Sequence, residues 1–169
     1  MSAGFRFEKK PGDVLYAADY NADTALPKLH LRNYMENVTL NTETAPKAVV
    51  LRASFSPVYV GYILYNRIFM KGAVIKNTGT ASAQTGIDMQ YAFYRGGERI
   101  FSTTNYAFVA NIEAGGSVTA DFILNSVGIY VGNIIDEVEI TIQLLMRDQT
   151  GATVPGEMNI PQLWAVADV

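Results

Sequence analysis

Apolar and polar residues alternate with a period of two along most of this sequence, and this alternation limits what it can fold into. From about residue 36 to residue 147, apolar and polar residues alternate along short runs, and glycine, proline or asparagine separates the runs. In residues 136–147, for example, valine and isoleucine alternate with glutamate and threonine. Such alternation is typical of a strand that buries one face and exposes the other. The pattern therefore predicts a chain built mainly of β-strands.

The predicted strands define the fold class. They are residues 38–42, 48–55, 58–65, 67–76, 85–95, 98–103, 105–112, 118–124 and 136–147, with a further strand around His30. Gly96 and Gly97 predict a tight hairpin, and residues 77–79 predict a turn. Strands of this kind bury one face against a second sheet, so we expect an all-β antiparallel sandwich, immunoglobulin-like or jelly roll. A closed barrel is the remaining alternative.

The two ends of the chain lack the strand pattern. Only residues 15–26 have a helical composition, and residues 149–169 contain the breakers TGATVPG and IPQ. We therefore expect three parts: an N-terminal attachment segment over residues 1–27, a sandwich domain over 28–147, and an extended C-terminal arm over 148–169. The arm carries the lone tryptophan, Trp164.

Composition excludes several classes of function. The chain has no cysteine, so thiolate metal sites and cysteine nucleophiles are excluded. Its formal net charge is -3 and no basic run occurs, which argues against a nucleic-acid partner. The start has no apolar signal region, and the apolar runs are shorter than the ~20 residues of a membrane helix. We expect synthesis in the cytoplasm, with no membrane partner.

Candidate catalytic and metal-binding residues are few. His30 is the only histidine, and it shares a predicted strand face with charged residues. The acidic set Asp136, Glu137 and Glu139 resembles the paired carboxylates of glycoside hydrolysis, but Glu137 and Glu139 share the polar face of a strand, which is the ordinary place for solvated carboxylates. Asp19 begins a spacing that resembles a calcium loop, but Thr24 stands where the turn glycine belongs and His30 where the last ligand belongs. We expect no enzymatic activity, no metal and no cofactor.

Tyrosine is the side chain with the most binding potential. The chain has 10 tyrosines, many of them in predicted strands or adjoining turns, and only 17% charged residues. An average soluble domain has ~25% charged residues, so apolar surface is expected to face protein partners. Exposed rings on a rigid sandwich also suit a carbohydrate or receptor. This gives an alternative function, a carbohydrate- or receptor-binding module with a host-surface glycan as partner.

Residues 72–124 carry a first family resemblance. The strand ending VIKNTG, the pair FY before GG, and the turn GGS before a strand containing phenylalanine resemble the immunoglobulin-like modules of the FxLYD and late-embryogenesis-abundant type. The resemblance covers about a third of the chain. It implies a sandwich fold and no particular function.

The opening segment carries a second resemblance. FEKKPGDVLYAADYNADTAL is similar to the F-x-x-G-x-x-L-x-A-x-D-x-N segment near the N-termini of tailed-bacteriophage fibre, neck-appendage and baseplate proteins. One extra residue between Phe7 and Gly12 departs from that pattern. In that family the region attaches the protein to the virion, so Asp19 and Asn21 are expected to make turn or cap hydrogen bonds.

These observations lead to one expectation about function. We expect a non-enzymatic structural protein of a tailed-phage virion, of the fibre, neck, baseplate or capsid-decoration type, that forms a homo-oligomer with other virion proteins as partners. The residues expected to contact partners are Phe7, Val14, Leu15, Tyr20 and Trp164.

Overall fold

The computed structural model describes residues 29–43, 47–63, 65–126 and 129–169, and these residues form eight β-strands without a helix. The strands are β1 (His30–Asn41), β2 (Ala48–Ile63), β3 (Tyr65–Asn77), β4 (Ala83–Arg95), β5 (Glu98–Ile112), β6 (Ser117–Ser126), β7 (Ile129–Arg147) and β8 (Gly156–Asp168). Phe7, Val14, Leu15 and Tyr20 lie outside the described residues, as does the segment 1–27 that carries them.

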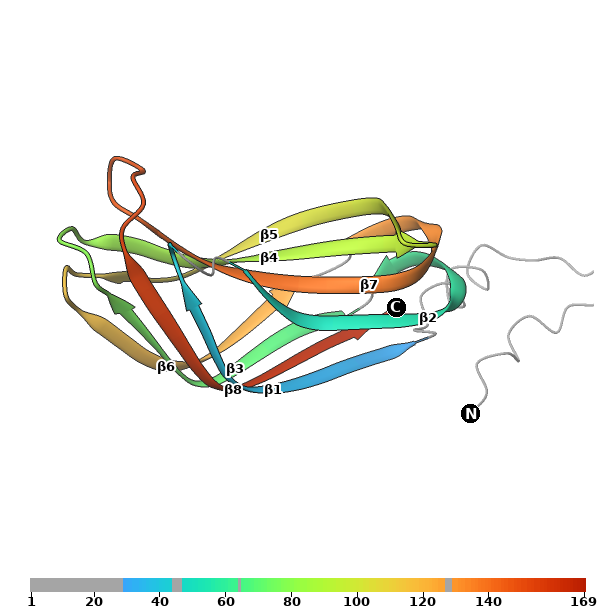
Figure 1. Ribbon diagram of the computed structural model, residues 1–169, viewed down its shortest axis with the longest axis horizontal. Helices are drawn as coiled ribbons and strands as arrows, with labels where there is room; N and C mark the ends of the chain where they lie inside the picture. Colours follow the sequence, from blue (N-terminus) through green and yellow to red (C-terminus); the bar gives the residue numbers. More distant parts are fainter. Residues whose placement is uncertain (1–28, 44–46, 64, 127–128) are drawn as a thin grey trace, which may run out of the picture.

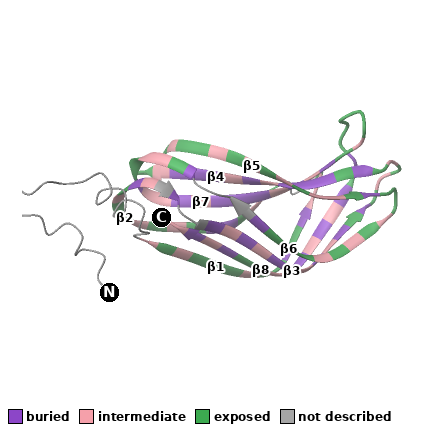
Figure 2. Ribbon diagram, turned by 180° about the vertical axis from the view of Figure 1, so that it is seen from behind, coloured by how far each residue is buried: buried purple, intermediate pink, exposed green. Residues whose placement is uncertain are grey.

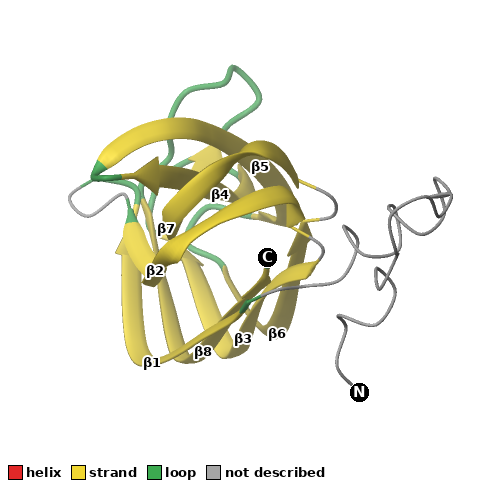
Figure 3. Cartoon of the chain, turned by 90° about the vertical axis from the view of Figure 1, so that its right-hand side faces the viewer, coloured by secondary structure: helices red, strands yellow, loops and turns green. Residues whose placement is uncertain are grey.

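The strands form two four-stranded antiparallel sheets that pack face to face (Figures 1 and 3). Sheet A has the order β1-β8-β3-β6, and sheet B has the order β2-β7-β4-β5. Eight strands distributed in this way make the double Greek key of a jelly roll. The predicted all-β sandwich is confirmed, and of the two topologies left open by the sequence the strand order selects the jelly roll.

The core lies between the sheets, where buried positions alternate with exposed ones along each strand (Figure 2). Its largest fully buried side chains include Tyr91 and Phe93 of β4 and Ile68 and Met70 of β3. A buried side-chain hydrogen bond crosses this core: Tyr91 Oη of sheet B donates to Asn66 Oδ1 of sheet A at 2.7 Å. The bond satisfies the buried tyrosine hydroxyl and links the two sheets.

The prediction of an extended C-terminal arm is wrong. Gly156–Asp168 forms β8, which pairs with β1 on one side and β3 on the other, so the last strand lies in the middle of sheet A. Its inward residues change phase at the exposed Pro161: Met158 and Ile160 are buried before it, and Leu163 and Ala165 after it. Because of this phase change, residues 156–168 do not show a continuous period of two in the sequence. The sandwich includes these residues and extends to Val169.

Three neighbouring strands bend at the level of Pro161. Asn37 of β1 has φ 54° and Gly72 of β3 has φ 66°, and both residues lie beside Pro161 in the register of the sheet. A Cβ on Gly72 would lie 3.7 Å from the proline ring. Proline cannot donate to the ladder and positive φ values occur at bulges, so the sheet folds along this line (Figure 1).

Two pairs of predicted strands are single strands. Residues 48–55 and 58–65 belong largely to β2, whose pairing with β7 shifts between Ser54 and Val58, around Pro57. Residues 98–103 and 105–112 merge into β5. The edge position of β2 and β5 in sheet B tolerates these irregularities. The hairpin at Gly96 and Gly97 is confirmed, with φ values of 57° and 82°.

Candidate functional site: an apolar row on the outer face of sheet A

Four apolar side chains form a row across the outer face of sheet A. Trp164 of β8 pairs with Tyr34 of β1 and with Phe69 of β3, and Phe69 pairs with Ile123 of β6. Residues opposite one another on neighbouring strands point to the same face. The row Tyr34, Trp164, Phe69 and Ile123, called here the apolar row, therefore spans the whole width of the sheet.

The row is open to solvent although it is apolar. Ile123 is 58% exposed, Tyr34 is 43% exposed and Trp164 is 36% exposed. The Tyr34 and Trp164 ring centroids lie 5.1 Å apart with the planes tilted by 41°, so the two rings support each other. Contiguous apolar surface bordered by polar residues is characteristic of an interaction site.

Charged residues border the row on both sides. The next level of the sheet on one side holds Glu36, Lys71 and Asp121, and the next level on the other side holds Arg32 and Arg67. Most of these residues are fixed: Arg32 Nη1 donates to Asp168 Oδ1 at 2.7 Å. The Tyr34 hydroxyl donates to Glu36 Oε1, also at 2.7 Å. This hydrogen bond to Glu36 raises the pKa of Tyr34 above its ordinary value.

A groove of about 410 Å³ runs along the row between β3, β6 and β8. The residues that line it are Phe69, Met70, Lys71, Asp121, Phe122, Ile123, Trp164 and Val166. The pairing of β3 with β6 shifts between Met70 and Ala73. There the Gly72 amide donates a 2.7 Å hydrogen bond to Asp121 Oδ1 in place of a regular ladder bond. The bulge thus gives the apolar row a concave border.

Sequence reasoning named one member of this site. Trp164 was expected to contact a partner, and it lies in the centre of the row, although on a strand rather than on an arm. Tyr34, Phe69 and Ile123 were not named. The sequence contained a signal for Ile123: this apolar residue shares the polar face of its strand with Asp121 and Thr119, which indicates an exposed apolar side chain. Recognising the row needed the strand order, which brings four distant segments to one level.

The carboxylates considered as catalytic candidates make surface contacts. Glu137 Oε1 lies 2.9 Å from Arg52 Nη2, and Glu137 Oε2 accepts a 3.0 Å hydrogen bond from Ser54. Glu139 also pairs with Arg52. The pKa of Arg52 is raised above its ordinary value, mainly by the hydrogen bond between Arg52 and Glu137. Asp136 accepts a 2.7 Å hydrogen bond from the Gly96 amide. Asp136 and Glu137 are neighbours on one strand, so they point to opposite faces.

His30 also has a structural partner. Its Nδ1 lies 3.1 Å from Asp168 Oδ1, the carboxylate oxygen that also binds Arg32. Within the described ranges no group of three or more histidine, cysteine, aspartate or glutamate residues is placed to hold a metal ion. The described residues also contain no helix long and apolar enough to cross a membrane. The calcium-like spacing at Asp19 lies outside the described residues.

Comparisons with known proteins give no family for this chain. No protein-family model matches it, and no curated protein matches it. Among solved structures, the chain is similar to one from infectious bursal disease virus, Gx strain, at 12% identity, covering 83% of this chain and 32% of that chain, with a TM-score of 0.44. A structure of particles derived from the same virus shows 11% identity, covering 84% of this chain and 32% of that chain, with a TM-score of 0.42.

A bacterial protein is among the similar structures too. Latent PorU from Porphyromonas gingivalis shows 11% identity over 84% of this chain and 13% of that chain, with a TM-score of 0.37. The chain thus spans about a third of the viral chains and a smaller part of PorU. Similarity at this level supports no conclusion about what this chain does.

Proposed function

We propose that this protein is a non-enzymatic structural component of a tailed-phage virion that forms a homo-oligomer through the apolar row and attaches to the particle through its N-terminal segment. One observation carries the proposal: four apolar side chains from four strands stand in line on a solvent-facing sheet. The jelly-roll order is one of the folds used by capsid domains, and the N-terminal segment resembles virion-attachment segments.

The physical reason for assembly is the cost of leaving the row in water. Burial of apolar surface is favourable by roughly 25 cal/mol per Å². Large aromatic side chains near the centre of an interface contribute most of its binding energy, and Trp and Tyr are the residues most often found there. Trp164 on the inner strand β8 packs against Tyr34 on the edge strand β1, so we assign this pair the central role.

The charged borders suit a second copy of the same chain. The border with Arg32 and Arg67 is positive, and the border with Glu36, Lys71 and Asp121 is net negative. A two-fold axis along the row places the positive border of one copy over the negative border of the other. Opposite charges across an interface set its register and exclude other arrangements.

The area of the row explains why a second contact is required. Four strands ~4.8 Å apart and three residue levels ~6.7 Å apart cover roughly 400 Å². A stable partner surface usually contributes about 800 Å². We assign the missing area to the N-terminal segment, whose apolar residues Phe7, Val14, Leu15 and Tyr20 supply anchors for a neighbouring subunit or virion protein.

The first experiment measures the oligomeric state of the purified full chain by sedimentation velocity over a dilution series. Trp164→Glu, and separately Ile123→Glu, are expected to shift the protein to monomers while thermal unfolding stays cooperative. Tyr130→Glu is the matched control, because Tyr130 is 56% exposed on sheet B. A wild-type chain that stays monomeric at all concentrations, or an oligomer unaffected by both row variants, contradicts the proposal.

The second experiment tests attachment to the particle. Deleting residues 1–26 is expected to leave the sandwich folded, because the described fold begins where Leu29 pairs with Val169 through hydrogen bonds of 2.8 and 3.0 Å. The deletion is expected to abolish incorporation, measured by mass spectrometry of purified particles from the source that encodes the chain. Absence of the wild-type chain from those particles, or normal incorporation of the deletion variant, overturns this part of the proposal.

A further inference from the structure

The outer face of sheet B contains an aromatic ring lying on a glycine. Gly86 of β4 pairs with Leu145 of β7 and with Phe108 of β5. A Cβ at Gly86 would lie 2.3 Å from the hydroxyl end of the Tyr106 ring. The ring therefore rests on the backbone of Gly86, in a position that any side chain there would block. Tyr106 is 51% exposed, so its other face is open to solvent.

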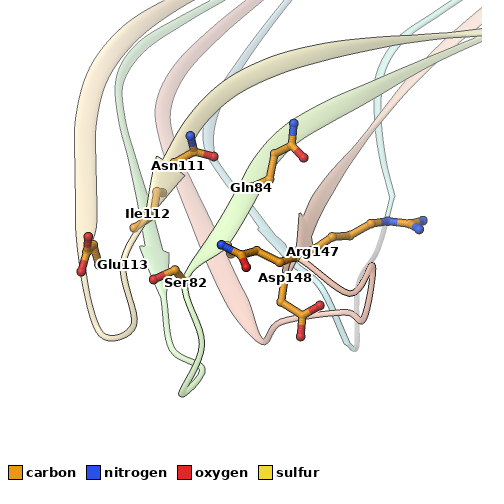
Figure 4. Close-up of a pocket in the computed structure, with 9 residues that line it drawn as sticks. Ser82, Gln84, Asn111, Ile112, Glu113, Arg147 and Asp148 are labelled. Carbon is orange, nitrogen blue, oxygen red and sulfur yellow. The ribbon is translucent and has the colours of Figure 1, made fainter.

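Two hollows lie beside each other here, and the smaller one includes the Tyr106 ring. One of about 290 Å³ lies between Tyr106, Leu145, Gln84 and Arg147. A second, of about 420 Å³, shares Gln84 and Arg147 and continues toward the loops at the end of the sheet. Figure 4 shows the lining side chains of this second hollow, with Ser82 and Asp148 near the loops, Asn111 and Gln84 further along their strands, and Arg147 extending away from Asn111. Together the hollows make a shallow site with an aromatic wall and a polar continuation.

The polar groups of this site are available to a ligand. Within the part of the chain that the structure describes, the side chains of Gln84, Asn111 and Arg147 form no hydrogen bond or close ion pair, and Arg147 interacts with the Asp88 carboxylate only by longer-range attraction. Each amide offers both donors and an acceptor, and the guanidinium offers donors. Asp148 differs, because its carboxylate accepts hydrogen bonds from Thr150 and Ala152 and shapes the loop.

We propose that this site binds a neutral pyranose sugar of an oligosaccharide. The apolar C–H face of a pyranose ring stacks on an exposed aromatic face, and its hydroxyl groups pair with amides and a guanidinium around the ring. The charged residues of the two hollows are Arg147, Glu113 and Asp148. Their sum is negative, which disfavours anionic sugars. Gln84 and Arg147 border both hollows, so they contact the sugar in either half of the site.

The lining favours a sugar over a protein partner. A protein interface centres on apolar anchors in a dry contact, as on the apolar row. Here Tyr106 and the neighbouring exposed Phe108 lie next to amides and charged groups that would have to be desolvated together. A small polyhydroxy ligand satisfies those groups directly, and small-molecule sites typically combine an apolar wall with a few polar groups.

The test is a glycan array printed with neutral hexose and N-acetylhexosamine oligosaccharides and with sialylated oligosaccharides, followed by NMR titration of the full chain with the best neutral glycan. Tyr106→Ala is expected to weaken binding by about tenfold. Gly86→Ala keeps every polar group and displaces only the ring, so it is expected to weaken binding to a similar extent. Gln84→Ala is expected to weaken binding less.

Tyr130→Ala is the matched control. Tyr130 is 56% exposed, and a Cβ at Gly132 would lie 2.8 Å from its ring, so it repeats the tyrosine-on-glycine arrangement away from the two hollows. Binding must survive in this variant, and thermal unfolding checks that all variants fold. Absence of binding to every neutral glycan, preference for sialylated glycans, or equal loss in Tyr130→Ala overturns the proposal. A lower oligomeric mass in Tyr106→Ala would instead assign the ring to a protein interface.

Discussion

The outer faces of the two sheets differ in how their exposed apolar residues are organised. On sheet A the large apolar residues share one level and form the apolar row, with charges confined to its borders. On sheet B the exposed apolar residues are spread over several levels, such as Tyr106 and Phe108 on β5 and Tyr130 and Ile134 on β7, and the ion pairs of Arg52 with Glu137 and Glu139 lie on the same sheet. A row can be buried as a unit against another flat surface. An exposed ring that borders amide and guanidinium groups suits a small ligand better. We therefore assign assembly to sheet A and ligand binding to sheet B.

The largest expected effect comes from removing β8. A chain ending at Thr150 loses the strand between β1 and β3, together with the buried side chains of Met158, Ile160 and Leu163. Both neighbours of β8 then expose unpaired edges and sheet B loses part of its cover. We expect no cooperative unfolding transition in circular dichroism. A truncated chain with a sharp transition would show that sheet B folds without an intact sheet A.

A smaller effect is expected from the buried hydrogen bond between Tyr91 and Asn66, which links the two sheets. Tyr91→Phe removes the hydroxyl that donates to Asn66 and leaves the buried Asn66 oxygen without this donor. Such a change costs about 1–3 kcal/mol of unfolding free energy, measured by urea denaturation. Tyr94→Phe is the control, because Tyr94 lies on the outer face of the same strand. Equal stability of the two variants would mean that the bond does not hold the sheets together.

The next prediction compares the two outer faces directly. Ile123→Thr on β6 and Val49→Thr on β2 make the same kind of change at exposed edge-strand positions, 58% and 45% exposed. Each is expected to change stability by no more than about 0.5 kcal/mol. Only Ile123→Thr is expected to weaken self-association, by several-fold in sedimentation velocity. Similar effects of both changes would remove the distinction between the faces.

The sequence predicted the sandwich because its evidence is local. Alternation, the glycine pair at 96 and 97, and the turn at 77–79 each depend on neighbouring residues. Strand β8 was missed because Pro161 interrupts its alternation, and only its pairing with β1 and β3 shows that both halves belong to one strand. The two sites were not predictable for a related reason. Tyr34, Trp164, Phe69 and Ile123 become neighbours only through the jelly-roll order, and Gly86 explains Tyr106 only once their strands are paired.

The smallest expected effect concerns a carboxylate on the outer face of sheet B. Partial burial raises the pKa of Asp88 above its ordinary value, although Arg147 and Lys47 oppose the shift. The native state therefore holds this proton more tightly than the unfolded state, and the stability from that preference is lost as the pH rises through the native pKa. Asp88→Asn should raise stability at pH 7 by about a few tenths of a kcal/mol, because solvent screens much of the effect. The gain should vanish near about pH 3.

Asp148→Asn is the control of opposite sign. Hydrogen bonding, first from the Thr150 side chain, lowers the pKa of Asp148, so the contribution of this carboxylate to stability is present at neutral pH and lost on acidification. Melting temperatures at both pH values decide the matter, and a destabilised Asp88→Asn at neutral pH would show that attraction to Arg147 and Lys47 outweighs the cost of burial.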